Sequence, residues 1–468
     1  MNKIQIPESP HDLAWDITTA CNLNCRFCYN VSGRAHSAES RELIDLVLEN
    51  IKELKPLHLG IGGGEPLLSP YIKEILQEIV LMGSKTPMIT INSMEIHDHE
   101  PVIRFVKTLN EELPDERIGF YISVHGTENT HDAMVGKKGH FHEIIKGVDL
   151  LKKYEVRFAM GFVPTIFNKN ERQAVLAFAQ KMGATLFNVS QFVPIGKGQQ
   201  KYNLTPHEYN ELTTWVKMQN ERLNHRYVVA QERWLGVLDE DLFRNELFIG
   251  CSAGIYYLGL RSNGDIVPCQ LNGYVLDNIR NSRLRDVWHK NVVLEEWRRR
   301  NVKGKCGMCH FLFKCGGCRC NAVAYTGDFL GEDLMCPFTQ AELTEQYQQL
   351  TQKQIQIQNA EELHDLPDVE SVLKDLKDDT ELIRIPALST TQGDTLIIRH
   401  ERIDALVELT GDARVIYELV PDDTPITFGE LAKLFEEKMR RRMLMGEFSD
   451  LVKYELINFL EETRCRGV

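Results

Sequence analysis

Cys21-Asn-Leu-Asn-Cys25-Arg-Phe-Cys28-Tyr29 is the stretch of this 468-residue chain from which a fold can be predicted. Thiolates at this C-x₃-C-x₂-C spacing can bind three irons of a four-iron, four-sulfur cluster, which leaves the fourth iron open to a small molecule. Zinc is the alternative, but zinc knuckles usually pair two C-x₂-C units and close with a fourth ligand. The nearest such residue is His36, so the spacing favours an iron–sulfur cluster.

The surrounding sequence predicts that the cysteines follow a buried strand. Residues Leu13–Ala20 have the composition of such a strand, a helical pattern covers Glu39–Leu54, and a second strand covers His58–Ile61. That second strand ends in Gly62-Gly63-Gly64-Glu65-Pro66. Glycines at a strand end allow a ligand to approach the backbone, and Glu65 could bind an ammonium group there.

Strand and helix patterns continue to alternate beyond this point, which favours parallel βαβ units. We expect strands at Met88–Asn92, Ile118–His125, Val156–Val163 and Thr185–Val193, and helices near Val102–Leu109, His142–Lys153 and Glu171–Met182. When parallel βαβ units form a barrel, ligands bind at the C-terminal ends of its strands. The polar residues expected there are Asn92, Ser93, Ser123 and His125.

The three cysteines, Phe27 before the last of them, and Gly63-Gly64-Glu65-Pro66 together resemble the radical SAM superfamily. The resemblance implies an α/β fold with a partial (β/α)₆ TIM-like barrel. It implies that S-adenosylmethionine (SAM) binds the open iron and is cleaved reductively to a 5′-deoxyadenosyl radical. It also implies that Gly63, Gly64 and Glu65 contact the SAM amine, and that Asn92 and Ser123 approach its carboxylate and ribose.

A second cysteine set lies beyond the barrel, with eight cysteines between residues 251 and 336. Disulfides are one alternative, but residues 1–16 are polar and do not resemble a signal peptide. Clustered cysteines in a chain that is not secreted indicate metal binding. A zinc ribbon would need only four of them.

This set resembles the SPASM domain, an auxiliary iron–sulfur module of radical SAM maturases. Gly264-x₄-Cys269 and Cys306-x₂-Cys309-x₅-Cys315 match its pattern, whereas Cys318 and Cys320 depart from the usual spacing of the next cysteine. The resemblance implies one cluster on Cys306, Cys309, Cys315 and Cys336. It implies a second on Cys251, Cys269 and Cys318, with Cys320 or an outside group as the fourth ligand. Cys465 is expected to be a free surface thiol.

Length suggests about three domains. We expect the barrel over residues 1–200, a connecting helical segment over 201–250, the SPASM domain over 251–345, a linker over 346–380 and a small C-terminal domain over 381–468. In the last we predict strands at Ile383–Leu388 and Thr395–Ile398, then helices at Ala405–Leu409, Arg414–Leu419, Phe428–Arg440 and Phe448–Thr463. This order resembles winged-helix-like modules that bind leader peptides; a helical oligomerisation or capping domain is the alternative.

The function we expect is radical SAM modification of a ribosomally made precursor peptide, giving a thioether or carbon–carbon crosslink. Modification of a tetrapyrrole (haem pathway) or metal-cofactor precursor is the alternative on the same scaffold. A non-enzymatic electron carrier or cluster scaffold is the alternative from another class. A flavodoxin- or ferredoxin-like electron donor is the partner that the resemblance implies. The sequence identifies no catalytic acid or base.

Composition excludes other classes. The net charge of −13 argues against nucleic acid as the main partner. Hydrophobic residues make up 43% of the chain, enough for substantial cores, yet no apolar run approaches a membrane span. We therefore expect a cytoplasmic protein that binds neither nucleic acid nor membrane.

Overall fold

The computed structural model describes residues 4, 6–33, 40–113, 117–223, 228–230, 235–245 and 248–359, and parts of 381–459. The chain divides into two compact units, Met1–Gln348 and Gln349–Val468. His36, Cys465 and most of the expected linker lie outside the described residues. The two units are described separately, and the cysteines of interest belong to the first.

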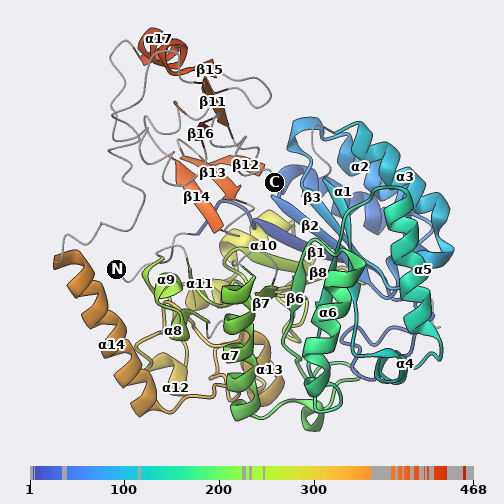
Figure 1. Cartoon of the computed structure of the whole chain (residues 1–468), viewed down its shortest axis with the longest axis horizontal. Helices are drawn as coiled ribbons and strands as arrows, with labels where there is room; N and C mark the ends of the chain where they lie inside the picture. The colour runs from blue at the N-terminus through green and yellow to red at the C-terminus, as the bar shows by residue number, and fades with distance from the viewer. Residues whose placement is uncertain are drawn as a thin grey trace. The chain divides into compact units, whose positions relative to one another are not determined.

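The first unit is built on one ten-stranded sheet with the order β10-β9-β8-β1-β2-β3-β4-β5-β6-β7 (Figure 1). Strands β1 to β7 pair in parallel with their neighbours. These strands are β1 (Asp12–Thr18), β2 (His58–Gly63), β3 (Met88–Asn92), β4 (Ile118–Ser123), β5 (Phe158–Phe162), β6 (Phe187–Val189) and β7 (Val228–Ala230). Their carboxyl ends share one edge of the sheet, where a ligand site is expected.

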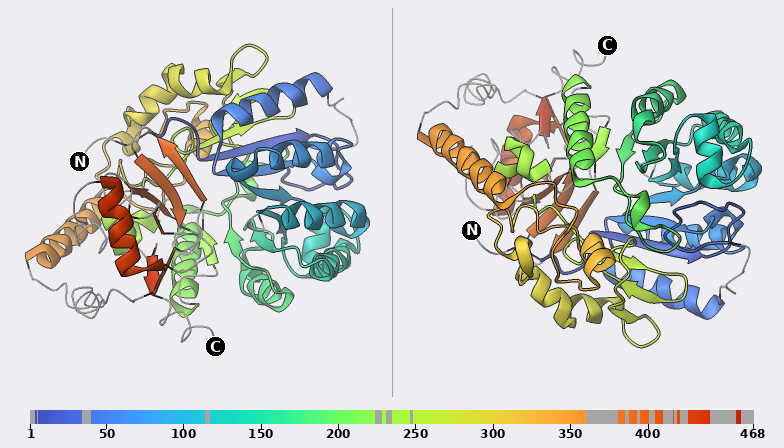
Figure 2. Two further views of the ribbon diagram at one scale, coloured as in Figure 1. Left: turned by 90° about the horizontal axis from the view of Figure 1, so that it is seen from above. Right: turned by 90° about the horizontal axis from the view of Figure 1, so that it is seen from below.

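Helices connect these strands and lie outside the curved sheet, as Figure 2 shows from two sides. They are α1 (Arg41–Leu54), α2 (Ile72–Val80), α3 (Glu100–Glu111), α4 (Glu128–Val135), α5 (His140–Lys153), α6 (Arg172–Met182) and α7 (Pro206–Arg222). Each presents an apolar face to the strands; in α1, for example, Val47 and Ile51 have no exposed surface. This is the α/β partial barrel that the sequence predicts.

The six barrel strands are confirmed, although most end earlier than expected. The sixth is the clearest case, because β6 covers only three residues of the predicted Thr185–Val193. Beyond it, Phe192 and Val193 are buried outside any strand. Within the barrel, helices α2 and α4 and strand β7 were not predicted; β7 comes from the segment expected to be helical.

The second cysteine set is attached directly to this sheet. Strand β8 (Tyr257–Leu260) pairs in parallel with β1 over Asp12–Trp15. The hairpin then continues antiparallel through β9 (Asp265–Val267) and β10 (Asp277–Asn278). Short helices follow: α10 (Leu284–Lys290), α11 (Val292–Arg298), α12 (Gly304–Gly307) and α13 (Arg319–Thr326), with α8 (Leu235–Leu238) and α9 (Glu240–Arg244) before the hairpin. The long helix α14 (Gln340–Asn359) comes last.

The second unit contains more strand than expected. Its described strands form two three-stranded sheets, β15-β11-β16 and β12-β13-β14. They are β11 (Glu381–Arg384), β12 (Leu388–Gln392), β13 (Thr395–His400), β14 (Ala405–Leu409), β15 (Ile426–Thr427) and β16 (Ile457–Phe459), with helix α17 (Phe428–Met439).

The helix expected at Ala405–Leu409 is wrong, because this segment pairs antiparallel with β13 as strand β14. Its five residues are too few for periodicity to separate helix from strand. Within the helix expected at Phe448–Thr463, Ile457–Phe459 is a strand paired with β11. The helix expected from Phe428 is confirmed as α17. A wholly helical C-terminal domain is therefore excluded.

Among the described residues, no helix combines the length and apolar character required to cross a membrane.

Candidate functional site

The loop Cys21–Gly33 follows β1 at the carboxyl edge of the parallel sheet and carries three cysteines. All three thiols are partly exposed, and none forms a disulfide. They lie close enough to influence one another: the neighbouring thiols, after burial, raise the pKa of Cys25, which reaches about 12. Three neighbouring thiols on one loop fit a cluster with three protein ligands.

Gly63, the last residue of β2, and Gly64 pack against the end of β1 and the residues that lead into this loop. A Cβ on Gly63 would lie 2.3 Å from the carbonyl oxygen of Thr18, and one on Gly64 would lie 2.1 Å from that of Ala20. The backbone N–H of Gly64 donates to Thr18 O (2.8 Å), and that of Glu65 donates to Ala20 O (2.7 Å). The glycines are thus required for the close approach of two protein segments, a reason that the sequence analysis did not identify.

Glu65 is buried, with 2% of its surface exposed. Its carboxylate accepts hydrogen bonds from Ser93 Oγ (2.7 Å), from the Met94 N–H (3.0 Å) and from the Leu67 N–H (3.1 Å). Burial raises its pKa to about 7 in spite of these donors. The side chain is held rigidly at the strand end, one residue beyond the glycines.

Asn92 and Ser123 end strands β3 and β4 at the same edge. The Asn92 amide donates to Ile61 O (3.1 Å), and its side chain lies beside Gly62. Opposite it on β1 is Asp16, whose Oδ1 would lie 3.3 Å from a Cβ on Gly62. The structure therefore brings Asn92 close to the end of β1. Ser123 lies on the next strand, β4, in register with Gly161.

Two further segments, at Gly196–Lys197 and at Gly136, contact the cysteine loop. Lys197 donates through its backbone to Cys28 O (2.9 Å) and through Nζ to Asn24 Oδ1 (3.0 Å) and Ser32 O (2.9 Å). Gly196 adopts φ 60°, and a Cβ there would lie 2.4 Å from Cys28 O. Gly136, after α4, approaches Asn24 in the same way.

A chain of buried histidines lies behind Phe27. The Phe27 ring meets the His125 ring edge-on at 4.8 Å. The His125 backbone N–H donates to His131 Nδ1 (3.1 Å), and His131 Nε2 lies 2.8 Å from His140 Nδ1. His140 Nε2 in turn lies 3.1 Å from Glu95 Oε1. Because His131 Nδ1 accepts a hydrogen bond, the Nε2 of the neutral ring carries the proton and donates to His140, so the chain has one direction and holds the end of β4 in place.

Glu95, His97 and Glu143 lie close enough to hold a cation. Lys137 already occupies this position, with Nζ 2.6 Å from Glu143 and 3.2 Å from Glu95. Burial would raise the pKa of Glu95, but His140 and Lys137 lower it to about 2. These residues thus form an ion-pair network beside His140, the last residue of the histidine chain.

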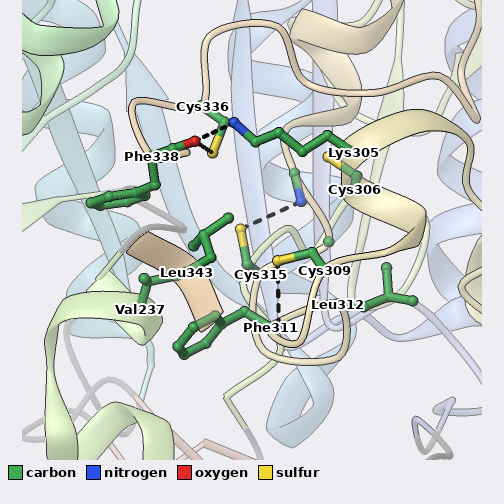
Figure 3. Close-up of a pocket in the computed structure, with 12 residues that line it drawn as sticks. Val237, Lys305, Cys306, Cys309, Phe311, Leu312, Cys315, Cys336, Phe338 and Leu343 are labelled. Atoms are coloured by element: carbon green, nitrogen blue, oxygen red, sulfur yellow. Dashed lines mark hydrogen bonds between the residues drawn. The ribbon is translucent and has the colours of Figure 1, made fainter. Parts of the chain in front are cut away.

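The cysteines predicted for one auxiliary cluster share a cavity, shown in Figure 3. The lining contains Cys306, Cys309, Cys315 and Cys336. Three sulfurs accept backbone hydrogen bonds: Cys306 from Asp333 N (3.3 Å), Cys309 from Phe311 N (3.4 Å) and Cys315 from Gly317 N (3.4 Å). Lys305 lies beside the fourth thiol, that of Cys336. Burial raises the pKa of this thiol, and the charge of Lys305 offsets part of the rise. Four thiols in one cavity, three of which accept backbone N–H donors, fit a closed cluster site.

The remaining cysteines separate into two places. Cys318 and Cys320 are buried together with Val193, and Cys269 packs against them. Hydrogen bonding to Cys269 and Cys318 raises the pKa of the Cys320 thiol, so the three sulfurs are neighbours. Cys251 instead packs against an apolar cluster that includes Trp297 and Phe329. The geometry places Cys320 with Cys269 and Cys318, as a fourth ligand would be.

Sequence comparisons agree with this arrangement. Residues 15–179 match the family model of the radical SAM superfamily, and residues 251–315 match that of the SPASM iron–sulfur cluster-binding domain.

Relatives and solved structures are similar to most of the chain. An AdoMet-dependent heme synthase of Methanosarcina barkeri is 26% identical over 71% of this chain and 98% of the relative. The sporulation killing factor maturation protein SkfB of Bacillus subtilis is 24% identical over 59% of this chain and 64% of the relative.

Streptococcus suis SuiB has a similar fold, in structures bound to S-adenosylmethionine and to the precursor peptide SuiA. The TM-score is 0.58 and the identity 19%, over 71% of this chain and 78% and 77% of SuiB. The chain is therefore an enzyme that carries a radical SAM domain over residues 15–179 and a SPASM domain over residues 251–315.

Proposed function

We propose that this enzyme oxidises a ribosomally made precursor peptide by radical SAM chemistry, forming a thioether or carbon–carbon crosslink. Bound SAM, reductively cleaved at the cluster, would supply the radical that takes a hydrogen atom from the peptide. Such a crosslink leaves the substrate oxidised, so the enzyme also needs a site that accepts an electron. The auxiliary cysteines would hold that site.

One observation carries the proposal: strand β1, which leads into the cysteine loop, pairs directly with strand β8 of the SPASM hairpin. The three-cysteine loop, which follows β1, and the hairpin that leads to Cys269 are consequently attached to the same sheet. A polar link joins the two sets, since Asp16 accepts a hydrogen bond from Tyr29 (2.8 Å), which follows Cys28, and lies near Gln270, which follows Cys269. A substrate bound between them would face both kinds of site.

Residue roles follow from this placement. Cys21, Cys25 and Cys28 would bind the cluster that takes SAM. Gly63, Gly64, Glu65, Asn92 and Ser123 would form the SAM pocket. Cys306, Cys309, Cys315 and Cys336 would hold one auxiliary cluster. Cys269, Cys318 and Cys320, which are neighbours, would supply ligands of the other, to which Cys251 was also expected to belong.

The relatives support a peptide substrate and also a second candidate. SkfB is named as a maturation protein, mycofactocin maturase MftC is another relative, and SuiB is solved with its precursor peptide. The heme synthase matches over nearly its full length, which favours a tetrapyrrole as the second candidate. In either case an external one-electron donor such as flavodoxin or ferredoxin would reduce the first cluster. The density of thiols favours a cytoplasmic location.

The C-terminal unit has no assigned role in this chemistry. We propose that residues 381–468 form a separate domain with the limits expected from the sequence. We further propose that this domain binds the leader of the precursor peptide. The described strands of this unit would offer edges to an extended peptide.

The deciding experiment measures 5′-deoxyadenosine formed anaerobically by the reconstituted, reduced enzyme. Candidate leader-bearing peptides and tetrapyrrole precursors would be supplied separately, and the mass of each recovered substrate measured. Stimulation by a peptide, with a loss of two hydrogens from it, supports the proposal. Stimulation by a tetrapyrrole alone would replace it with the second candidate.

A further inference from the structure

Arg300 is a buried arginine beside the second cysteine set, with only 3% of its surface exposed. Its guanidinium lies over the Trp297 ring, 3.9 Å from the centroid. Its Nη2 donates to Ile249 O (2.8 Å). Its Nε and Nη1 are buried and have no hydrogen-bond acceptor among the described residues. Two nitrogens without acceptors on a buried cation are costly, so they point to a partner that the protein atoms do not supply.

The neighbours of Arg300 are cysteines of both proposed auxiliary sites. The backbone N–H of Cys251 donates to Cys315 O (3.1 Å), which brings these two cysteines together. Gly316 adopts φ 68°, and a Cβ there would lie 2.3 Å from Arg300 Nη1. Gly316 also lines the cavity that contains Cys315. The guanidinium therefore lies against the wall of that cavity.

The charge of Arg300 has no carboxylate partner in the described part of the chain. Burial lowers its pKa to about 10, and the Cys251 and Cys315 thiols act in the opposite direction. A guanidinium is protonated at neutral pH, so Arg300 is a cation. Thiolates bound to iron would supply the negative counter-charge for it.

Arg319 also lies over the Trp297 ring, but its hydrogen bonds are those of an arginine with a structural role. It lies 4.9 Å from the Trp297 centroid and is fully buried. Its N–H groups donate to the carbonyl oxygens of Phe329, Gly331 and Gly316. Arg319 thus holds the loop around the cysteines, whereas Arg300 keeps donors and charge available.

We propose that Arg300 tunes the auxiliary clusters: its fixed positive charge stabilises the reduced form and raises the reduction potential of at least one of them. Each electron that a cluster accepts adds one negative charge, and a buried cation nearby lowers the cost of that charge. Net charge and hydrogen bonds to sulfur are the main determinants of such potentials. This inference rests on the auxiliary-cluster part of the proposed function.

The test is a redox titration of the loaded enzyme, followed by electron paramagnetic resonance, for the wild type, Arg300→Met and Arg300→Lys. We expect Arg300→Met to lower the midpoint potential of an auxiliary cluster, with at least a tenfold lower reduced-to-oxidised ratio at fixed potential, which for one electron is about 59 mV. Arg300→Lys should retain most of the wild-type potential because it keeps the charge.

Arg298 provides a matched control two residues away. It lies over the Trp288 ring at 4.2 Å, and burial alone lowers its pKa to about 10. Arg298→Met should therefore leave the potentials unchanged. Iron content, measured for every variant, shows whether the clusters are loaded.

The two assignments fail in different ways. An unchanged potential in a fully loaded Arg300→Met enzyme would overturn the inference and leave the cluster assignment intact. A wild-type enzyme without auxiliary-cluster signals would overturn the cluster assignment and the inference together. An equal shift in Arg298→Met would also overturn it, since the effect would then not depend on the cysteines.

Discussion

The three-cysteine loop and the four-cysteine cavity both bring thiols together, but different contacts hold the thiols in the two places. The loop takes its cysteines from eight consecutive residues and is held from outside, by Lys197 and by the glycines after β2. The cavity collects its cysteines from residues 306 to 336, and three of them accept N–H donors from their own short segment. Three ligands leave a position open for chemistry, whereas four close the site for electron storage.

The largest effect should come from Cys28→Ala. Two remaining thiolates cannot hold the cluster in the loop. Loss of a group that only supports a metal ligand costs up to roughly 100-fold in activity, so loss of a ligand should lower SAM cleavage by more than that. The measurement is 5′-deoxyadenosine per enzyme under reducing conditions. Normal cleavage by this variant would contradict the assignment of the loop.

Cys336→Ala tests the other side of the comparison. The variant should lose the iron of one auxiliary cluster and form little crosslinked product, while SAM cleavage falls much less. Iron content, 5′-deoxyadenosine and product are measured on the same sample. Equal loss of cleavage and product would show that the cavity is not a separate functional site.

Gly64→Ala tests whether the loop depends on contact with the barrel. An added Cβ would lie 2.1 Å from Ala20 O, so backbone must shift and we expect a loss of roughly 3 kcal/mol in the free energy of unfolding, in the range for strained or overpacked sites.

Gly33→Ala is the matched control for Gly64→Ala. Gly33 lies on the same cysteine loop, and a Cβ there would meet nothing within 4 Å. Thermal unfolding of the cluster-free protein should separate the two variants. Equal stability would mean that Gly64 is required only by the ligand.

The sequence predicted the barrel well because its signals are local. Long apolar strands alternate with amphipathic helices, and the cysteine and glycine motifs stand at strand ends. The reason for the glycines was not predictable, since Gly64 meets Ala20 only after two strands pair. The same holds for Arg300, His125 and His140: an isolated charged or imidazole side chain gives no sequence signal for the tryptophan, cysteine or histidine that folding places beside it.

Short apolar segments were the other limit. Ala405–Leu409 was predicted as a helix and is a strand, because its pairing partner on β13 decides the outcome. Strand β7 was missed for a similar reason, since three residues carry no period.

Asp16 joins the two regions and gives the smallest expected effect. It is buried, and its Oδ1 accepts the Tyr29 hydroxyl at 2.8 Å. Burial raises its pKa to about 7, against the lowering effects of Tyr29, Gln270 and Arg261. Because this value is above that of an unfolded Asp, near 3.9, the folded state binds the extra proton and stability falls as the pH rises from about 4 to 7.

Asp16→Asn should remove that dependence. Relative to the wild type, the unfolding free energy of Asp16→Asn should rise by roughly 1–3 kcal/mol between pH 5 and pH 7.5, a range that allows for water relieving part of the burial. The measurement is the melting temperature of both proteins across this pH range. Tyr29→Phe would remove the hydroxyl that favours the carboxylate, so it should steepen the wild-type loss of stability. A pH-independent difference in Asp16→Asn would show that the carboxyl is already ionised, and that the link between the cysteine loop and the SPASM hairpin is a fixed charge.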